Sequence, residues 1–192
     1  NVSVQVFTAG GNWFGEAVTG ASGVYTVAGL ATGTYYVRTS NSFPYQNELY
    51  DNLSCPPSGC TMTTGTGVAV TAGATTANID FGLVAGASIT GTVMHAGNGA
   101  PMVNVRVLVE SASGGWGGES FTDASGVYTV YGLATGTWYV RTAYGLPYVD
   151  KLYDDLPCLR GACAMTAGKG VSVTAGAATG GIDFVLTKTR SG

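Results

Sequence analysis

Apolar and polar residues alternate along short segments of the chain, and a period of two predicts β-strands. Val2, Val4 and Val6 alternate with polar residues, and Val105, Val107 and Val109 repeat this pattern later in the chain. Further strands are expected at residues 24–27, 34–39, 67–71 and 79–83, each bounded by Gly-containing turns. No segment shows helical periodicity, so the expected fold class is all-β.

An internal repeat organises these strands. Shifting the sequence by 103 positions aligns residues 1–83 with 104–186 without a gap, and roughly 50 of the pairs are identical. Short strands at regular spacing predict an antiparallel β-sandwich for each copy. We therefore expect two tandem sandwiches, residues 1–84 and 85–186, followed by a C-terminal tail at 187–192.

The two copies are not equally complete. The second copy has an additional alternating strand at residues 87–93, whereas the first begins at Asn1, the equivalent of Asn104. The first sandwich should therefore lack its N-terminal strand and leave an open assembly edge beside Val2, Val4 and Val6. Either upstream sequence of a longer chain supplies that strand, or a neighbouring molecule does so by β-strand addition. Residues 187–192 lack apolar alternation and make a poor donor.

Composition and charge exclude several classes of function. Only 10% of residues are charged and the net charge is −3, so no basic surface is available for nucleic acid. No run of apolar residues is long enough for a membrane-spanning segment. The first lysine is Lys151, which excludes a Lys-based isopeptide bond within the first copy. Few lysines also leave the edge strands without their usual protection against pairing.

The four cysteines lie in equivalent loops of the two copies. Cys55 and Cys60 have the same spacing as Cys158 and Cys163, which favours one local disulfide in each copy. A four-thiolate metal site is the alternative, but it needs both loops to converge and usually has a shorter spacing. We expect disulfides, no metal and no cofactor. Disulfides indicate an oxidising compartment and thus an extracellular or cell-surface protein.

Three other features carry candidate chemistry. Residues 49–53 and 152–156 place acidic and amide side chains in a loop, which suggests either calcium ligation or a solvated turn; the turn is favoured. Trp13 and Trp116 lie in Gly-rich stretches and would either stack on a sugar or pack against protein. His95, the one histidine, is expected in an exposed turn. The sequence pattern identifies no nucleophile or carboxylate as a catalytic partner for His95, so we expect no catalysis.

The second copy resembles a known family. The residues that carry the resemblance are Ile-Thr-Gly-Thr-Val at 89–93, Thr-Asp-Ala-Ser-Gly-Val-Tyr at 122–128, and the segment 132–140. They are similar to the carboxypeptidase regulatory-like domain. The resemblance implies a transthyretin-like, Ig-like β-sandwich that occurs as tandem repeats in secreted and surface-exposed bacterial proteins. It also implies an accessory or structural role.

Two functional hypotheses follow. The first is a non-catalytic extracellular structural module, the building block of a cell-surface stalk or filament whose partners are copies of itself. The alternative is a carbohydrate-binding or adhesive accessory module of a secreted protein, which holds a polysaccharide through Trp13 and Trp116.

Overall fold

The structure is a computed structural model that describes residues 1–40, 44–56, 59–158 and 163–189. The chain forms two compact units, Asn1–Val84 and Ala85–Gly192. Helical structure in the described ranges consists of two short 3-10 turns, η1 (Met62–Thr64) and η3 (Met165–Ala167). Within those ranges no helix is long and apolar enough to cross a bilayer. The fold is all-β, as expected.

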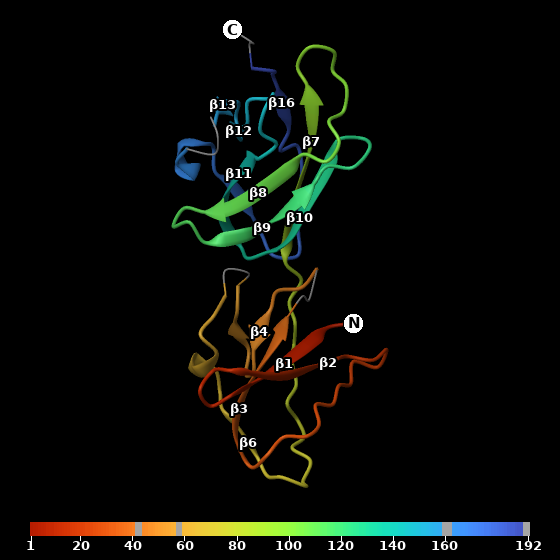
Figure 1. Cartoon of the computed structure of the whole chain (residues 1–192), viewed down its shortest axis with the longest axis vertical. Helices are drawn as coiled ribbons and strands as arrows, with labels where there is room; N and C mark the ends of the chain where they lie inside the picture. The colour runs from red at the N-terminus through yellow and green to blue at the C-terminus, as the bar shows by residue number, and fades with distance from the viewer. Residues whose placement is uncertain (41–43, 57–58, 159–162, 190–192) are drawn as a thin grey trace. The chain divides into compact units, whose positions relative to one another are not determined.

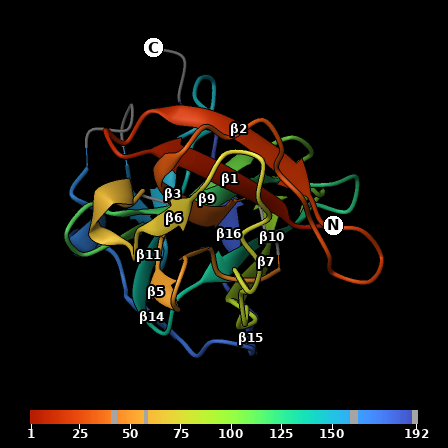
Figure 2. The same cartoon turned by 90° about the horizontal axis from the view of Figure 1, so that it is seen from below.

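Unit 1 contains one antiparallel sheet with the order β2-β1-β3-β4-β5, and β6 pairs with β3. Figure 2 shows β1 between β2 and β3. Alternation places Val4, Val6, Tyr35 and Val37 on the buried face of this sheet. The strands are β1 (Ser3–Thr8), β2 (Trp13–Val18), β3 (Gly33–Ser40), β4 (Glu48–Leu49), β5 (Leu53–Ser54) and β6 (Val68–Val70).

Unit 2 repeats this sheet and adds a second one. The repeated sheet has the order β13-β12-β11-β8-β9, with β14 paired to β11. Its strands are β8 (Arg106–Ser111), β9 (Trp116–Phe121), β11 (Gly136–Thr142), β12 (Lys151–Leu152), β13 (Leu156–Pro157) and β14 (Val171–Val173).

The second sheet of unit 2 is built around β7 (Ala87–His95). On one side β7 pairs antiparallel with β10 (Val127–Leu133), and on the other side it pairs parallel with β15 (Ala178–Thr179) and β16 (Phe184–Leu186). The two sheets enclose a core that includes Ile89, Val107, Tyr128 and Phe184. Unit 2 is therefore a complete sandwich.

Unit 1 has no second sheet in its described part. Residues 24–27 and 79–83, which the sequence predicts as strands, form none, and Figure 1 draws these segments without arrows. The copy of the first segment lies within β10, and the copy of the second includes β16. The prediction is wrong for unit 1 because the central strand that would hydrogen-bond both segments has no counterpart there.

The expected C-terminal tail also needs correction. The Val149 amide donates to the Thr187 carbonyl oxygen at 2.9 Å, and the Thr189 amide donates to the Pro147 carbonyl oxygen at 2.7 Å. Residues 187–189 are thus attached to unit 2 rather than forming a separate tail. Residues 190–192 lie outside the described part.

Candidate functional site

The central strand of the second sheet is held from both sides in unit 2. Residues opposite one another include Tyr128 and Gly91, Val130 and Ile89, and Phe184 and Val93. The inward side chains of Ala87, Ile89 and Val93 are fully buried. This strand therefore completes both the hydrogen bonding and the core of unit 2.

We call residues 24–30 and 76–83 of unit 1 the flanking segments, because their copies flank β7 in unit 2. Within the described ranges, residues 25–30 make no backbone-to-backbone hydrogen bond. Their apolar side chains pack on the unit 1 core yet stay partly exposed, whereas the copies of these side chains are buried. The set comprises Tyr25, Val27, Leu30, Ile79 and Phe81, with copies Tyr128, Val130, Leu133, Ile182 and Phe184.

A tyrosine joins the two flanking segments. The Tyr25 hydroxyl donates to the Ile79 carbonyl oxygen at 2.7 Å, and the Tyr128 hydroxyl donates to the Ile182 carbonyl oxygen at 2.6 Å. Burial, with a smaller effect of the nearby Asp80 carboxylate, raises the pKa of Tyr25 to about 12. Stronger burial raises the pKa of Tyr128 further still. Both phenols are thus neutral donors over the physiological range.

The predicted assembly edge at Val2, Val4 and Val6 is wrong. β1 pairs with β2 on one side and with β3 on the other, and Val2 exchanges hydrogen bonds with Thr19. The missing strand belongs to the opposite sheet, because its copy β7 and the following β8 lie in different sheets. Sequence analysis missed the flanking segments; pairing each expected strand with its copy and its partners would have identified them.

Both predicted disulfides are present. Cys55 is bonded to Cys60 and Cys158 to Cys163, and the described residues contain no free cysteine. Arg38 of β3 lies near the first bridge, with its guanidinium over the Phe7 ring and its Nε donating to Gln5 Oε1 at 2.9 Å. Burial lowers the pKa of Arg38. The Cys55 and Cys158 sulfurs are buried, so each bridge anchors its loop to the sheet.

The acidic loops form tight turns. Asp51, Asn52, Asp154 and Asp155 all have positive φ, a conformation that Asp and Asn tolerate well. The Asp51 carboxylate accepts from the Thr66 hydroxyl at 3.2 Å. Asp155 pairs with Lys151 at 2.7 Å. Among the described residues, no group of three or more His, Cys, Asp or Glu side chains could hold a metal ion together, and calcium ligation by these loops stays a prediction.

The two tryptophans differ in their surroundings. Trp13 is 60% exposed at the start of β2, beside the partly exposed Phe14. Trp116 is partly buried at the start of β9. They are therefore not a matched pair of exposed aromatic platforms, and glycan binding through them stays a prediction.

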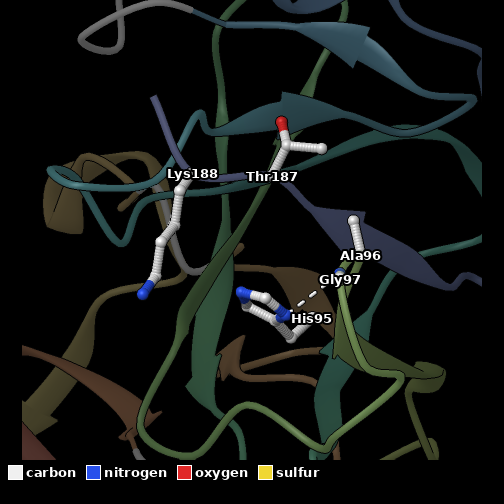
Figure 3. Close-up of a pocket in the computed structure, with 5 residues that line it drawn as sticks. All are labelled: His95, Ala96, Gly97, Thr187 and Lys188. Carbon is white, nitrogen blue, oxygen red and sulfur yellow. Dashed lines mark hydrogen bonds between the residues drawn. The ribbon is translucent and has the colours of Figure 1, made fainter. Parts of the chain in front are cut away.

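His95, Ala96, Gly97, Thr187 and Lys188 line a surface pocket in unit 2 (Figure 3). His95 ends β7 and is partly buried rather than exposed. Its Nδ1 accepts from the Gly97 amide at 3.0 Å, and its ring packs edge-on against Tyr148. This ring nitrogen is thus already engaged in shaping the turn, and the lining side chains include no carboxylate.

Glu48 is a buried carboxylate in β4 that sequence analysis did not single out. Its backbone amide donates to the Thr39 hydroxyl at 2.9 Å, while Oε2 has no hydrogen-bond partner among the described residues. Burial raises the pKa of Glu48. Its copy, Lys151, instead reaches the Asp155 carboxylate.

A family model, described as the carboxypeptidase regulatory-like domain, matches residues 88–187. No curated protein gives a match. Solved structures that are similar to this chain include the Bacillus anthracis TIE protein, with 11% identity and a TM-score of 0.38. The match covers 98% of this chain but only 31% of the TIE protein. They also include GBS52, the minor pilin of Streptococcus agalactiae (11%, TM-score 0.37, covering 100% of this chain and 84% of that one). The group B streptococcus pilus 2b backbone protein is a third (15%, TM-score 0.36, covering 97% and 78%).

Proposed function

We propose that this chain, which belongs to the carboxypeptidase regulatory-like domain family, is a non-catalytic structural module of a cell-surface stalk or filament. Its repeats join copies of themselves through contacts between strands. The observation that carries this proposal is that the outer strands of the two main sheets, β2 and β9, contain neither of the residues that most often block pairing between chains, lysine and proline.

The outer strands of the main sheets support the proposal. β2 pairs only with β1 among the described strands and exposes Trp13 and Val18, whose exposed fractions are 60% and 58%. In unit 2, β9 exposes Phe121. Each strand has a single charged side chain, Glu16 or Glu119, and neither contains a lysine or a proline, which are frequent protection against pairing with other chains. Such edges are tolerated best where they face copies of the same molecule.

The disulfides support an extracellular location. A disulfide persists in oxidising compartments and is reduced in the cytosol of most organisms. Both bridges close short loops, and each adds only about 2 kcal/mol by restricting the unfolded chain. Their presence in both copies suits a module that works outside the cell.

Sedimentation velocity at increasing protein concentration, combined with electron microscopy, tests the proposal. We expect concentration-dependent, open-ended assemblies, because a heterologous contact whose rotation does not close generates an open filament. The control is a chain with Val18→Lys and Phe121→Lys, which places a charge on each outer strand and should assemble less. A chain that stays monodisperse and monomeric at high concentration contradicts the proposal.

A further inference from the structure

We infer that the pocket at the end of β7 binds the carboxylate group of a small acid, held between His95 and Lys188. Its volume is about 320 Å³, which lies at the lower end of the range for small-molecule sites. The other described lining residues are Ala96, Gly97 and Thr187. Such a site needs no contact between copies of the chain and is therefore independent of the proposed function.

The histidine offers one hydrogen-bond donor to the pocket. Its Nδ1 accepts from the Gly97 amide at 3.0 Å, so this nitrogen carries no proton. In the neutral imidazole the proton then lies on Nε2, which becomes the donor. Nε2 has no hydrogen-bond partner among the described residues. In Figure 3 it lies on the side of the ring that faces away from Gly97 and toward Lys188.

The lysine offers a positive charge that no described carboxylate neutralises. Its ammonium group forms no ion pair with a described residue and lies 5.9 Å from the centre of the Tyr148 ring. The described lining of the pocket contains no acidic side chain. An anion that enters the pocket would therefore meet one cation and no competing acid among these residues.

One cation and one neutral donor suit a carboxylate. Its single negative charge is spread over two oxygens, so one oxygen can accept from Lys188 Nζ while the other accepts from His95 Nε2. Sulfate carries two negative charges, of which the described lining neutralises one. A neutral sugar gains nothing from the ammonium charge. The small side chains of Ala96 and Thr187 leave room for the carbon atoms of the acid.

The two segments that carry the donors are fixed by backbone hydrogen bonds. The Gly99 amide donates to the His95 carbonyl oxygen at 2.9 Å and closes the turn after β7. The Ala96 amide donates to the Leu186 carbonyl oxygen at 3.0 Å and joins this turn to the segment that contains Lys188. The spacing of the two donors is thus set by the fold of unit 2.

Tyr148 supports both donors from a loop that is itself held in place. Its ring centre lies 5.7 Å from that of His95, and the Lys188 ammonium lies over the same ring. The buried Asp150 carboxylate fixes the loop, accepting from the amides of Tyr144 at 2.6 Å and Gly145 at 3.0 Å. A ligand would therefore have little side-chain motion to restrict, which lowers the cost of binding.

A titration of the isotope-labelled whole chain with sodium acetate tests this inference. The NMR signals of the Gly97 amide and of His95 Nε2 are followed, and sodium chloride at the same ionic strength measures the general effect of salt. We expect saturable shifts with acetate that chloride does not reproduce. Sodium sulfate should bind more weakly than acetate.

Lys188→Met removes the charge while keeping an apolar side chain, and the exposed position should tolerate it. Acetate binding should weaken by about fivefold, the effect expected for one solvent-accessible charge contact. The matched control is Lys169→Met. The Lys169 ammonium also lies 5.9 Å from the centre of a tyrosine ring, that of Tyr153, yet Lys169 is not among the described lining residues. Its loss should leave acetate binding unchanged.

Sodium glucuronate and glucose identify the source of the carboxylate. Glucuronate that binds, alone or together with acetate, while glucose does not, shows that the pocket admits a carboxylate on a sugar ring. Binding of acetate alone restricts the ligand to smaller acids. Either result supports the inference.

Other results overturn it. These are shifts with neither acid, shifts that chloride reproduces, sulfate or glucose binding as tightly as the acids, and equal effects of Lys188→Met and Lys169→Met. The titrations use protein concentrations below those at which sedimentation detects assembly. Failure of the carboxylate site therefore leaves the proposed function standing, and a chain that never assembles can still bind acetate.

Discussion

Glu48 shows how one side chain couples the stability of unit 1 to pH. The residue as a whole is 8% exposed, and Oε2 of its carboxylate has no described partner to offset the loss of hydration. Burial raises its pKa, so the folded chain binds a proton there more readily than the unfolded chain does. Stability from this group is therefore fully present below the ordinary pKa of 4.5 and is lost as the pH rises through the raised pKa.

We predict that Glu48→Gln stabilises unit 1 at neutral pH by about 1 kcal/mol, because it removes a buried charge whose Oε2 has no partner among the described residues. The gain should vanish at acidic pH, where Glu48 itself is protonated. Urea unfolding between pH 3 and pH 8 measures the difference. The control is Glu110→Gln, a partly exposed glutamate on β8. A pH-independent difference at Glu48 would show that charge burial is not its cause.

At the scale of elements, the two copies fill the same position between two strands with different pairs of residues. The Trp138 ring of β11 lies over Gly117 of β9, where a Cβ atom would be 2.6 Å from the ring. In unit 1 the equivalents are Tyr35 and Phe14, whose rings pack edge to face at 5.8 Å. The tryptophan Nε1 and the tyrosine hydroxyl donate to equivalent carbonyls, those of Ala134 and Ala31. Ring size on one strand is matched to the residue two strands away.

We predict that Gly117→Phe destabilises unit 2 by about 2 kcal/mol, because the new side chain collides with Trp138. Trp138→Tyr alone should also be destabilising, since it leaves unfilled volume. The double variant copies the pair of unit 1 and should lose less than the sum of the single changes, with a coupling of about 1 kcal/mol. Denaturant unfolding of all four chains measures this cycle. Strictly additive losses would contradict the matched packing.

The local sequence pattern predicts some of these strands correctly, and the residues at which it predicts a strand wrongly can be named. Val2, Val4 and Val6 alternate and form β1 as expected, and the repeated Cys spacing identifies both disulfides. Residues 21–27 and 124–130 are identical in sequence, yet only the second segment includes part of a strand. A strand needs a hydrogen-bonding partner as well as its own pattern, and that partner is far away in sequence. The local pattern located residues 24–27 and 79–83 but, for the same reason, could not show that they form no strand.

At the scale of the molecule, the two units differ in how completely their equivalent apolar side chains are buried. Unit 2 buries Tyr128, Val130, Leu133, Ile182 and Phe184, while unit 1 leaves the same five residue types partly exposed. The apolar area withdrawn from water is the main source of folding stability. Unit 1 should consequently be the less stable of the two.

We predict two calorimetric transitions, with unit 1 unfolding at the lower temperature. Hydrogen exchange should be fast at residues 25–30 and slow at the equivalent 128–133, because only the latter amides lie in a paired strand. Fusing residues 85–103 ahead of Asn1 should raise the lower transition and slow exchange at 25–30. A single transition for the original chain, with equal protection of both segments, is the contrary result.

Arg38 is the sole lysine or arginine in residues 1–84, and it lies in β3 between β1 and β4 with its guanidinium held by Gln5 and Phe7. Trypsin-like proteases cut after these two residue types and need a segment of chain released from its sheet. Digestion of unit 1 by such proteases thus has one target, which becomes accessible only when β3 separates from its neighbouring strands. Such scarcity of cleavage points would make unit 1 resistant to trypsin-like proteases for as long as its sheet stays folded.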